Sequence, residues 1–535
     1  MASQPQRLIG GGAAIDLIGE DLLQNILTRL PAASFASAAS VSRSWNLVCG
    51  SILSRPKLSS ALSFNPSLQV AVEEVFNKVL SEPIRPHFAI ASISEKLGSA
   101  VPVITSAPHG IIGRDALRDE FKEVQWEITE DDNQGNNGNS SPYANRAIAL
   151  TIGYMPGLKV IGMPLLQSNE LHEGNLLEVS HKQQESRVSV IDEFVMDIME
   201  CSASISDSTS PAGIVMFADT ESDMKRVLEK MDYALSQETV IVGDGNGKFL
   251  YRGDYKKDIT RSPCESFAAV ALLFIKNRDK IHGIGETQFH VTLSTGLSPI
   301  GPTYKAASVR EIRDECYTWL TARREGSREK LDGQTILDHI YGEIGERIQY
   351  PAFYIGVIKR RKCSIGLDKV RWITSCAFHE VLGGDEEYLY AGDSGIKTGD
   401  SFRFYHSDSN TALSSCSNIS ANLRCLKQDC NHANTHNLGL GAANCNKKEV
   451  FGGFIFSCCG RGESFFGEPN IDSSPFLENF PGVTLAGSFC GGEIGRGDLS
   501  LYSRESQDQG SIRCCLHVFS SVCLVMSYTP PLLEH

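Results

Sequence analysis

The pattern of hydrophobic positions divides the chain near residue 86. Before that point, apolar residues recur at helical spacing, first within residues 17–62 and again within residues 65–85. After Pro86 the pattern changes to short apolar runs separated by turns rich in Gly, Pro and Asp. The sequence therefore predicts a mixed fold: a small all-α unit followed by a large α/β region with α+β layers.

Individual elements can be predicted within the large region. Two helices are expected, at Ser222–Leu235 and Val309–Arg323. The glycine-rich run Gly243–Gly247 predicts the turn of a β-hairpin, because it separates two short apolar runs. Strands are expected at Phe88–Ile93, Ala147–Ile152, Gly213–Ala218, Thr239–Val242, Ala268–Ile275, Phe353–Ile358, Phe402–Tyr405, Phe451–Ser457, Val483–Ser488 and Cys515–Met526.

Internal repeats give one weak signal. A strand, a helix, a second strand and a Gly-rich turn follow Gly213, and the same order follows Gly453. This self-similarity suggests two related halves. The fragment at residues 58–65 is not followed by further leucines in register, which argues against a leucine-rich solenoid. The polar stretches 127–142 and 427–448 are predicted to be loops, the first of them disordered.

Charge and composition narrow the class of partner. The chain has 50 basic and 64 acidic side chains, so its net charge of −14 disfavours nucleic-acid binding. We interpret the one basic run, Lys359–Lys362, as a solvated turn after the apolar run that precedes it. No leader and no apolar run of membrane-spanning length is evident, which predicts an intracellular protein, cytoplasmic and/or nuclear, with no membrane contact. Most of the 16 cysteines are then expected to be buried thiols rather than members of a disulfide framework.

The N-terminal helices carry a surface that needs a partner. An apolar stripe runs along the first helix, which Pro31 ends; its residues are Leu22, Leu23, Ile26, Leu27 and Leu30. A second helix is expected at Ala33–Ala39 and a third from about Val41. Three short helices bury too little surface to be stable alone, so an exposed apolar stripe indicates a binding partner.

This segment resembles an F-box, the helical motif that docks onto the Skp-family adaptor of cullin ubiquitin ligases. The matching residues are Ile18, Glu20, Leu22, Leu23, Ile26, Leu27, Leu30, Pro31, Val41, Arg43 and Trp45. The chain departs from the pattern at Gly19, where the family usually has Pro. The resemblance implies that Trp45 belongs to the packing of the F-box itself. It also implies an adaptor-facing set of Leu17, Ile18, Leu22, Leu23, Ile26, Leu27, Leu30, Pro31 and Val41.

A second resemblance lies in Gly453–Gly497, which is similar to the later part of the FIST region found in signalling proteins and in some F-box proteins. The matches are Phe456–Cys458, Arg461-Gly462, Phe466-Gly467, Leu485–Gly487 and Gly492–Gly495. The resemblance implies a small-ligand sensor, or in F-box proteins a substrate-binding surface. The expected divisions are a disordered N-terminus (1–14), the F-box (15–62), a helical linker (63–86) and two FIST parts (87–303 and 304–527).

The two Gly-rich motifs of the FIST-like segment each follow an apolar strand. They therefore lie at strand ends, where open α/β sheets tend to bind ligands. Arg461 could bind a carboxylate, and Glu493 could accept an amine, while Gly491 and Gly492 permit tight turns. In the alternative interpretation Arg461 pairs internally with Glu463 or Glu493. The candidate ligand- or substrate-binding residues are therefore Cys458, Arg461, Glu463, Gly491, Gly492 and Glu493.

Two chemical alternatives remain for the cysteines. A thiol enzyme would use Cys458, Cys459 or Cys490, although a buried, inert thiol is the ordinary role for such residues. A zinc site could use Cys425, Cys430, His432, His436 and Cys445, against the plain alternative of a polar loop.

The sequence as a whole predicts a non-catalytic receptor subunit without cofactors or metal, which binds a Skp-family adaptor, a cullin and a target protein. Its expected role is to promote ubiquitination and proteasomal degradation. The alternative role is that of an intracellular sensor for a small, amino-acid-like ligand.

Overall fold

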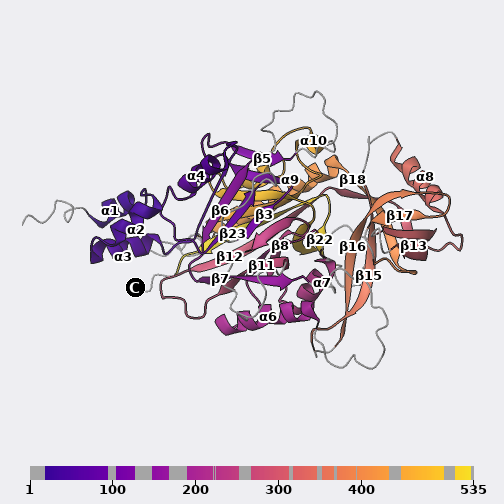
Figure 1. Ribbon diagram of the computed structural model, residues 1–535, viewed down its shortest axis with the longest axis horizontal. Coiled ribbons are helices and arrows are strands. Elements are labelled where there is room, and N and C mark those ends of the chain that lie inside the picture. Colours follow the sequence, from indigo (N-terminus) through magenta and orange to yellow (C-terminus); the bar gives the residue numbers. More distant parts are fainter. Residues whose placement is uncertain are drawn as a thin grey trace, which may run out of the picture.

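The computed structural model describes residues 19–93, 104–126, 147–167, 189–220, 222, 224–251, 267–312, 317–345, 352–366, 370–392, 395–432, 448–498 and 513–531. The predicted disordered stretches 1–14 and 127–142 lie outside these residues, as do Leu17 and Ile18. Figure 1 shows an elongated molecule with three parts along its length. Short helices lie at one end, stacked sheets with covering helices in the middle, and a strand-rich lobe at the other end.

The first part is a three-helix unit. Its helices are α1 (Glu20–Leu27), α2 (Ala32–Ala39) and α3 (Arg43–Ile52). Two acidic residues occupy the first turn of α1, where the helix dipole favours negative charge, and the Ser42 hydroxyl accepts a hydrogen bond from the Trp45 amide to cap α3. The small core consists of Leu23, Leu27, Phe35, Ala38, Val48 and Cys49, with Trp45 packed against it.

The middle part contains three sheets. A five-stranded sheet has the order β1 (Lys57–Ser63), β6 (Ile148–Tyr154), β2 (Phe88–Ile93), β3 (Ile104–Ala107) and β10 (Lys248–Tyr251). A six-stranded sheet has the order β12 (Glu286–Thr295), β23 (Ser520–Thr529), β19 (Glu449–Cys458), β20 (Thr484–Cys490), β4 (Gly110–Arg114) and β5 (Phe121–Gln125). The open half of a twelve-stranded sheet contains β22 (Arg513–His517), β21 (Glu493–Asp498), β9 (Val240–Asp244), β8 (Gly213–Ala218), β11 (Phe267–Lys276) and β7 (Leu158–Leu166).

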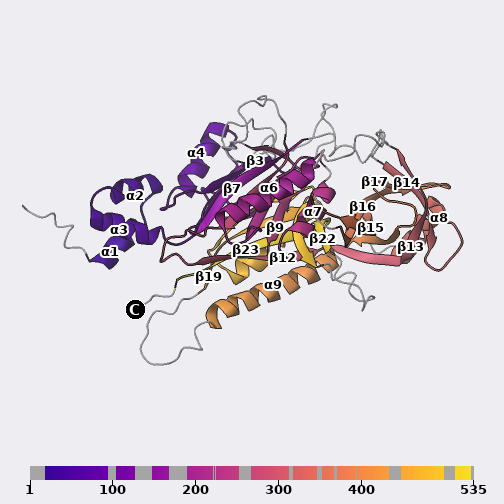
Figure 2. The ribbon, with the colours of Figure 1, turned by 90° about the horizontal axis from the view of Figure 1, so that it is seen from below.

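The main core lies between these sheets. Phe217 from β8, Phe274 from β11 and Phe456 from β19 are almost fully buried there. Helices cover the outer faces, so the middle part has four layers (Figures 1 and 2). The covering helices are α6 (Val190–Ile205) and α7 (Met224–Ala234) on one side, with α4 (Leu68–Val79), α9 (Ser409–His432), α10 (Glu463–Phe466) and α11 (Ser474–Asn479) on the other.

The third part is a barrel that closes within the twelve-stranded sheet. Its six strands follow the pairing order β15 (Phe353–Cys363), β18 (Ser401–Ser407), β13 (Leu297–Ile312), β14 (Tyr317–Arg324), β17 (Leu389–Gly392) and β16 (Arg371–Gly384). The pairing of β15 with β16 closes the ring. Helix α8 (Gly333–Ile344) buries Ile336 and Ile340 against this barrel. None of the described helices is both long and apolar enough to cross a membrane.

The predicted fold class is confirmed: a helical N-terminal unit precedes a large, sheet-rich α/β region. The weak repeat corresponds to two parallel strand pairs, because β8 pairs in parallel with β9 and β19 pairs in parallel with β20. The described residues form sheets and covering helices with no leucine-rich solenoid among them.

Four of the expected elements are wrong. Residues 309–323 belong to the antiparallel strands β13 and β14, not to a helix. Residues 515–526 contain two strands, β22 and β23, rather than one. The basic run Lys359–Lys362 lies inside strand β15, not in a turn. Strands β9 and β10 belong to different sheets, so Gly243–Gly247 is a crossing between layers and not a hairpin turn.

Two boundaries also differ from the expected ones. Residues 57–62, expected within the helical F-box, form most of strand β1, which pairs with β6. The helix expected in the linker is present as α4, but its Ala71, Val75 and Val79 are buried against the five-stranded sheet, so it packs on the large region. The polar stretch 427–448 begins as the last turns of α9.

Candidate functional site

The carboxyl ends of the two parallel strand pairs meet at one place. Strand β21 pairs with β9, and this pairing sets Glu493 opposite Asp244. The Gly245 amide donates a hydrogen bond of 2.7 Å to the Gly492 carbonyl. The loop after β9 therefore lies directly against the loop after β20, at the end of the sheets where α/β proteins tend to bind ligands. We call residues 243–247 and 490–493 the paired loops.

Glycine is required in the paired loops for steric reasons. A Cβ atom on Gly491 would lie 2.7 Å from the Asn246 carbonyl oxygen, and one on Gly243 would lie 1.9 Å from the Met216 carbonyl oxygen. Gly243 also has a φ of +152°, which side chains rarely adopt. Sequence reasoning selected Gly491 for a tight turn, whereas the structure shows a close approach to the Asn246 carbonyl, and it assigned Gly243 to a hairpin.

Two residues of the paired loops, Glu493 and Asp244, carry buried carboxyl groups. Glu493 is fully buried; its Oε2 accepts hydrogen bonds from the Ser520 amide (3.2 Å) and hydroxyl (2.8 Å), while its Oε1 has no partner. Burial raises the pKa of Glu493 well above its usual range. Asp244 is also buried, and burial raises its pKa to about 7. Hydrogen bonds from Asn246, Cys490 and Gly491 favour the ionised form and partly oppose this rise in pKa. Burial therefore favours the protonated form of both carboxyl groups over the ionised form.

Three thiols surround these carboxyl groups. Cys458 and Cys490 are buried and lie opposite each other at the ends of β19 and β20, whereas Cys459 is exposed. A hydrogen bond between Cys458 and Cys459 raises the pKa of Cys458 well above its usual range and lowers the pKa of Cys459. Burial raises the pKa of Cys490 strongly. Of these three thiols, Cys459 is therefore the one that alkylating reagents should reach first.

Arg461 lies next to the paired loops but faces inward. Its side chain is fully buried, and its Nη2 and Nε atoms lie 2.5 Å and 2.9 Å from the two carboxylate oxygens of Asp472. The remaining donors bond to the Phe519 carbonyl and the Ser294 hydroxyl, each at 3.0 Å. Neither acidic residue considered from the sequence pairs with Arg461; Glu463 is exposed at the start of α10, and the internal partner is Asp472. The geometry gives Arg461 a structural role.

Sequence reasoning missed two residues that hold this loop. Gln125 of β5 donates hydrogen bonds to the carbonyl groups of Cys459 (2.8 Å) and Arg461. Glu123 of the same strand accepts a hydrogen bond of 2.9 Å from the Ser473 amide, and burial beside Asp472 raises its pKa to about 7. Both come from a strand more than 300 residues away in the chain, so no local pattern could have revealed them.

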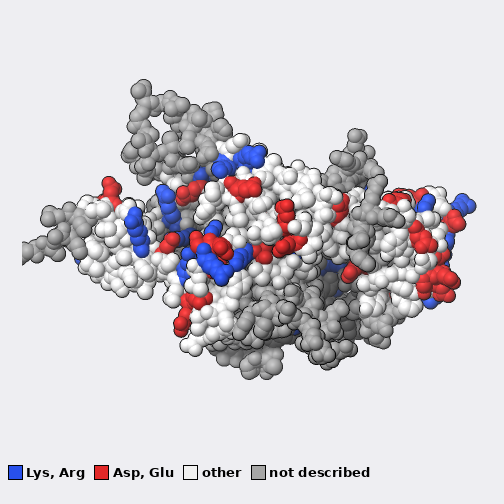
Figure 3. All heavy atoms as spheres, turned by 90° about the horizontal axis from the view of Figure 1, so that it is seen from above, with Lys and Arg blue, Asp and Glu red and all other residues white. Residues whose placement is uncertain are grey.

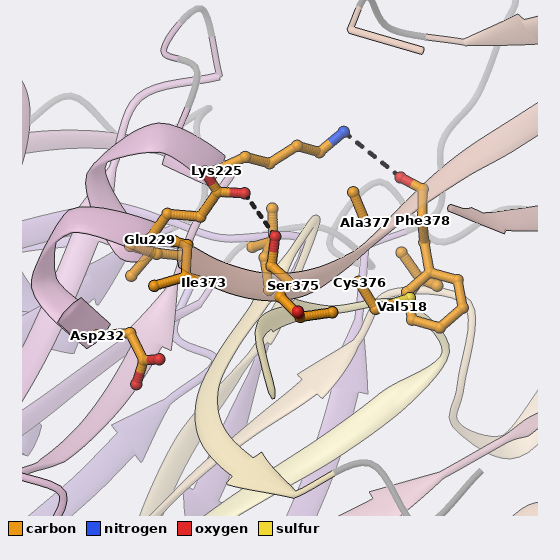
Figure 4. Close-up of a pocket in the computed structure, with 12 residues that line it drawn as sticks. Lys225, Glu229, Asp232, Ile373, Ser375, Cys376, Ala377, Phe378 and Val518 are labelled. Atoms are coloured by element: carbon orange, nitrogen blue, oxygen red, sulfur yellow. Dashed lines mark hydrogen bonds between the residues drawn. The ribbon is translucent and has the colours of Figure 1, made fainter. Parts of the chain in front are cut away.

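A cavity of about 60 Å³ lies beside the paired loops, between α7 and β16 (Figure 4). The Ser375 hydroxyl donates to Glu229 (2.8 Å) and the Lys225 ammonium group to the Phe378 carbonyl (3.4 Å), which join the helix to the strand. The side chain of Leu516 lines the cavity and also lies against Gly245. A cavity of this size is well below the several hundred Å³ of a typical small-molecule site.

A larger groove, of about 650 Å³, lies at the opposite ends of β8 and β9. Its lining is largely polar and includes Ser206, Glu238, Arg278, Thr287 and His290. The Thr287 hydroxyl is buried without a partner, and burial together with Lys448 lowers the pKa of His290 to about 4. None of the six candidate ligand residues predicted from the sequence lines this groove or the smaller cavity.

The described residues hold no cluster of three or more potential metal ligands. Of the zinc candidates, Cys425 is exposed on α9, and the other four have side chains outside the part of the chain that the structure describes. The zinc alternative therefore stays an untested prediction.

The N-terminal helices present a second candidate site. Leu23 and Leu27 fill the core of the helical unit, with exposed fractions of 5% and 0%. Leu22, Ile26 and Val41 point outward, with exposed fractions of 57%, 42% and 62%. Pro31 is also exposed and Leu30 is half-buried. Leu47, which sequence reasoning did not select, is the most exposed of these apolar side chains at 75%. We call these four exposed apolar side chains of the helical unit, Leu22, Ile26, Val41 and Leu47, the helical docking surface.

The fold and these surfaces define a two-part protein, in which a small helical docking unit is joined to a large layered α/β region. Residues 15–56 match the F-box domain family, and residues 380–496 match the FIST C domain family. The chain is also 42% identical over 532 residues to an F-box/LRR-repeat protein of Arabidopsis thaliana, covering 96% of this chain and 94% of that protein. The chain therefore belongs to the F-box protein family and carries a FIST C domain. Its F-box is the domain that binds a Skp-family adaptor within a cullin-based ubiquitin ligase.

Proposed function

We propose that this protein is a substrate receptor of such a ligase, in which the large region holds a target protein for ubiquitination and proteasomal degradation. The chain performs no bond chemistry in this proposal. It raises the effective concentration of target lysines near the recruited ubiquitin-conjugating enzyme. Its place of action is inside the cell.

The observation that carries this proposal is the helical docking surface. Its four apolar side chains remain exposed although the core of the same unit is filled. Several large apolar side chains left exposed on a small helical unit indicate a protein interface. The surface lies at the far end of the molecule from the barrel, so an adaptor bound there leaves the barrel and much of the sheet region accessible (Figure 1).

The test is co-purification of the full chain with a Skp-family adaptor and a cullin. The Leu22→Asp, Ile26→Asp double variant should lose the adaptor, because both side chains are exposed and would carry charge into the interface. A matched control, Met196→Asp with Leu413→Asp, places the same change on exposed apolar residues of α6 and α9 and should retain the adaptor. Leu23 is unsuitable for this test because it is buried in the F-box core.

Capture of the adaptor by the double variant, or loss of capture by the control, would contradict the proposal. Thermal unfolding of each variant shows whether the large region stays folded. Loss of adaptor with an unchanged melting temperature is the expected result.

A second candidate function is a small-ligand sensor, and the 650 Å³ groove favours it. The groove has the volume of a typical ligand site and contains the unpartnered Thr287 hydroxyl. A screen of free amino acids should then raise the melting temperature of the full chain. A thiol enzyme has less support, because the pKa of the exposed Cys459 is shifted by Cys458 and by carboxyl groups rather than by a histidine.

A further inference from the structure

Strands β15 and β16 extend beyond the barrel as a two-stranded ribbon that reaches toward α6 (Figure 1). Pairing of β15 with β18 ends at Ile358, so residues 359–363 pair only with 371–375 of β16. The far end is anchored, since Lys230 forms an ion pair with Asp192 (2.7 Å) and also donates to the Ser364 carbonyl. The ribbon is therefore held in place while its outward side chains stay accessible.

Successive side chains of strand β15 point to opposite faces of the ribbon, so the basic run Lys359–Lys362 is divided between two faces. Lys359 and Arg361 point toward the body of the protein, where Arg361 lies 3.6 Å from Glu229 and Lys359 is buried beside His379. Arg360 and Lys362 point the other way and are exposed. Their register partners across the strand pair are Thr374 and Trp372. Arg360, Lys362 and Trp372 therefore share one outward face, named the ribbon face.

Trp372 is the central feature of the ribbon face. Its exposed fraction is 56%, which is high for the side chain that most often dominates protein interfaces. The Arg360 guanidinium carbon lies 5.2 Å from the centre of the indole ring, and the Lys362 ammonium nitrogen lies 5.4 Å from it. These cation–π contacts orient both cations without neutralising them.

The ribbon face is positively charged on an acidic protein. Among the described residues, neither Arg360 nor Lys362 takes part in an ion pair. The nearest acid on the same face of β16 is Glu380, eight residues and about 26 Å along the strand. The two unneutralised cations beside the exposed indole ring can therefore pair with a negatively charged group from outside the chain.

We propose that the ribbon face binds an extended, anionic peptide segment of the target protein, with carboxylates or phosphates at Arg360 and Lys362 and an apolar side chain against Trp372. This inference rests on the proposed receptor function. Peptide is favoured over nucleic acid, because two cations form a small site and the net charge of −14 repels a long phosphate backbone.

The experiment measures how the full chain, in complex with its adaptor, binds three fluorescein-labelled peptides. Each peptide has twelve residues. One repeats Asp-Glu-Leu-Ser, the second carries phosphoserine in place of serine, and the third replaces Asp and Glu by Asn and Gln. Fluorescence anisotropy should show binding of the two anionic peptides and at least about tenfold weaker binding of the neutral one. Tighter binding of the phosphorylated peptide identifies phosphate as the preferred group; equal binding identifies carboxylate.

Two variants and one control locate the site. Trp372→Ala should weaken binding about tenfold, and Arg360→Glu with Lys362→Glu should abolish it. The control Arg323→Glu with Lys330→Glu makes the same charge change at exposed positions on and beside β14 and should stay within about twofold of the native chain. Absence of binding by both anionic peptides would overturn the proposal, as would equal weakening by the control or tighter binding of a twelve-nucleotide RNA.

Adaptor capture is scored in the same preparations. Failure of peptide binding with the adaptor still captured overturns only this inference. Peptide binding by a chain that fails to capture the adaptor overturns the proposed receptor function instead and leaves the ribbon face as a peptide-binding surface.

Discussion

Asp472 and Arg461 form an ion pair buried almost completely, with exposed fractions of 1% and 0% for their side chains. Removing one member of such a pair leaves an uncompensated charge in a low-dielectric environment. Asp472→Asn should therefore lower the free energy of unfolding by about 3–5 kcal/mol, measured by chemical denaturation. The control is Glu463→Gln, which changes an exposed acid two residues from Arg461 and should alter stability by less than about 0.5 kcal/mol. Equal effects would show that Asp472 is not the partner that stabilises Arg461.

Asp244 makes stability depend on pH in a direction opposite to that of most carboxyl groups. The pKa of Asp244 is about 7 in the folded protein, above the usual 3.8. At a pH between these two values, the folded state therefore holds a proton that the unfolded state has already released. The unfolding free energy should then fall as pH rises through this window, by up to about 1.4 kcal/mol per pH unit.

The Asp244→Asn variant carries no titrating group at this position. Its unfolding free energy should vary less between pH 5 and pH 7 than that of the native chain, by urea denaturation at each pH. Glu386→Gln, at an exposed position of the barrel lobe, should leave the native slope unchanged. An identical slope in Asp244→Asn would mean that another group, such as Glu123, controls this window.

At the scale of elements, the crossing after β9 depends on one glycine. Gly243→Ala would place a Cβ atom 1.9 Å from the Met216 carbonyl oxygen at a φ of +152°. The parallel pair of β8 and β9 should therefore be disturbed, with a loss of about 2 kcal/mol or more in the free energy of unfolding.

Gly342→Ala is the matched change in an exposed helix. Gly342 lies in α8, and no atom lies within 4 Å of the position that an alanine methyl group would take there. Alanine at this position should therefore stabilise the protein by about 0.5–1 kcal/mol. Thermal denaturation of both variants should show shifts of opposite sign. A loss of stability in Gly342→Ala would indicate that α8 packs differently in solution.

The wrongly predicted helix at residues 309–323 shows where local pattern is insufficient. Its apolar residues fit a helical period, yet β13 and β14 are held by pairing with β18 and β17 in the closed barrel. The pairing of β13 with β18 joins residue 297 to residue 407, a contact that no local window contains. Tertiary pairing overrides helical spacing here because it satisfies the backbone of six strands at once.

At the scale of the whole molecule, the F-box is continuous with the sheet region. Strand β1 follows α3 within a few residues and joins the five-stranded sheet, and the Ala32 amide donates to the Leu80 carbonyl (2.9 Å). An adaptor bound to the helical docking surface is therefore held in a defined orientation relative to the large region.

On the face shown in Figure 3, basic and acidic side chains are interspersed over the sheets, and acidic ones gather at the barrel end. A charged patch as small as the ribbon face can therefore be specific only through its local geometry.

The sequence by itself determined the division into a helical unit and an α/β region, most of the buried strands, and the F-box and FIST resemblances. These follow from periodicity and short motifs, which depend on neighbours within about ten residues. Only the tertiary structure decided that Arg461 pairs with Asp472 and that Glu493 faces Asp244. It also decided that a basic run has one buried and one exposed face. The physical reason is that burial and partnership depend on strands brought together from hundreds of residues apart, and a side chain's chemistry depends on both.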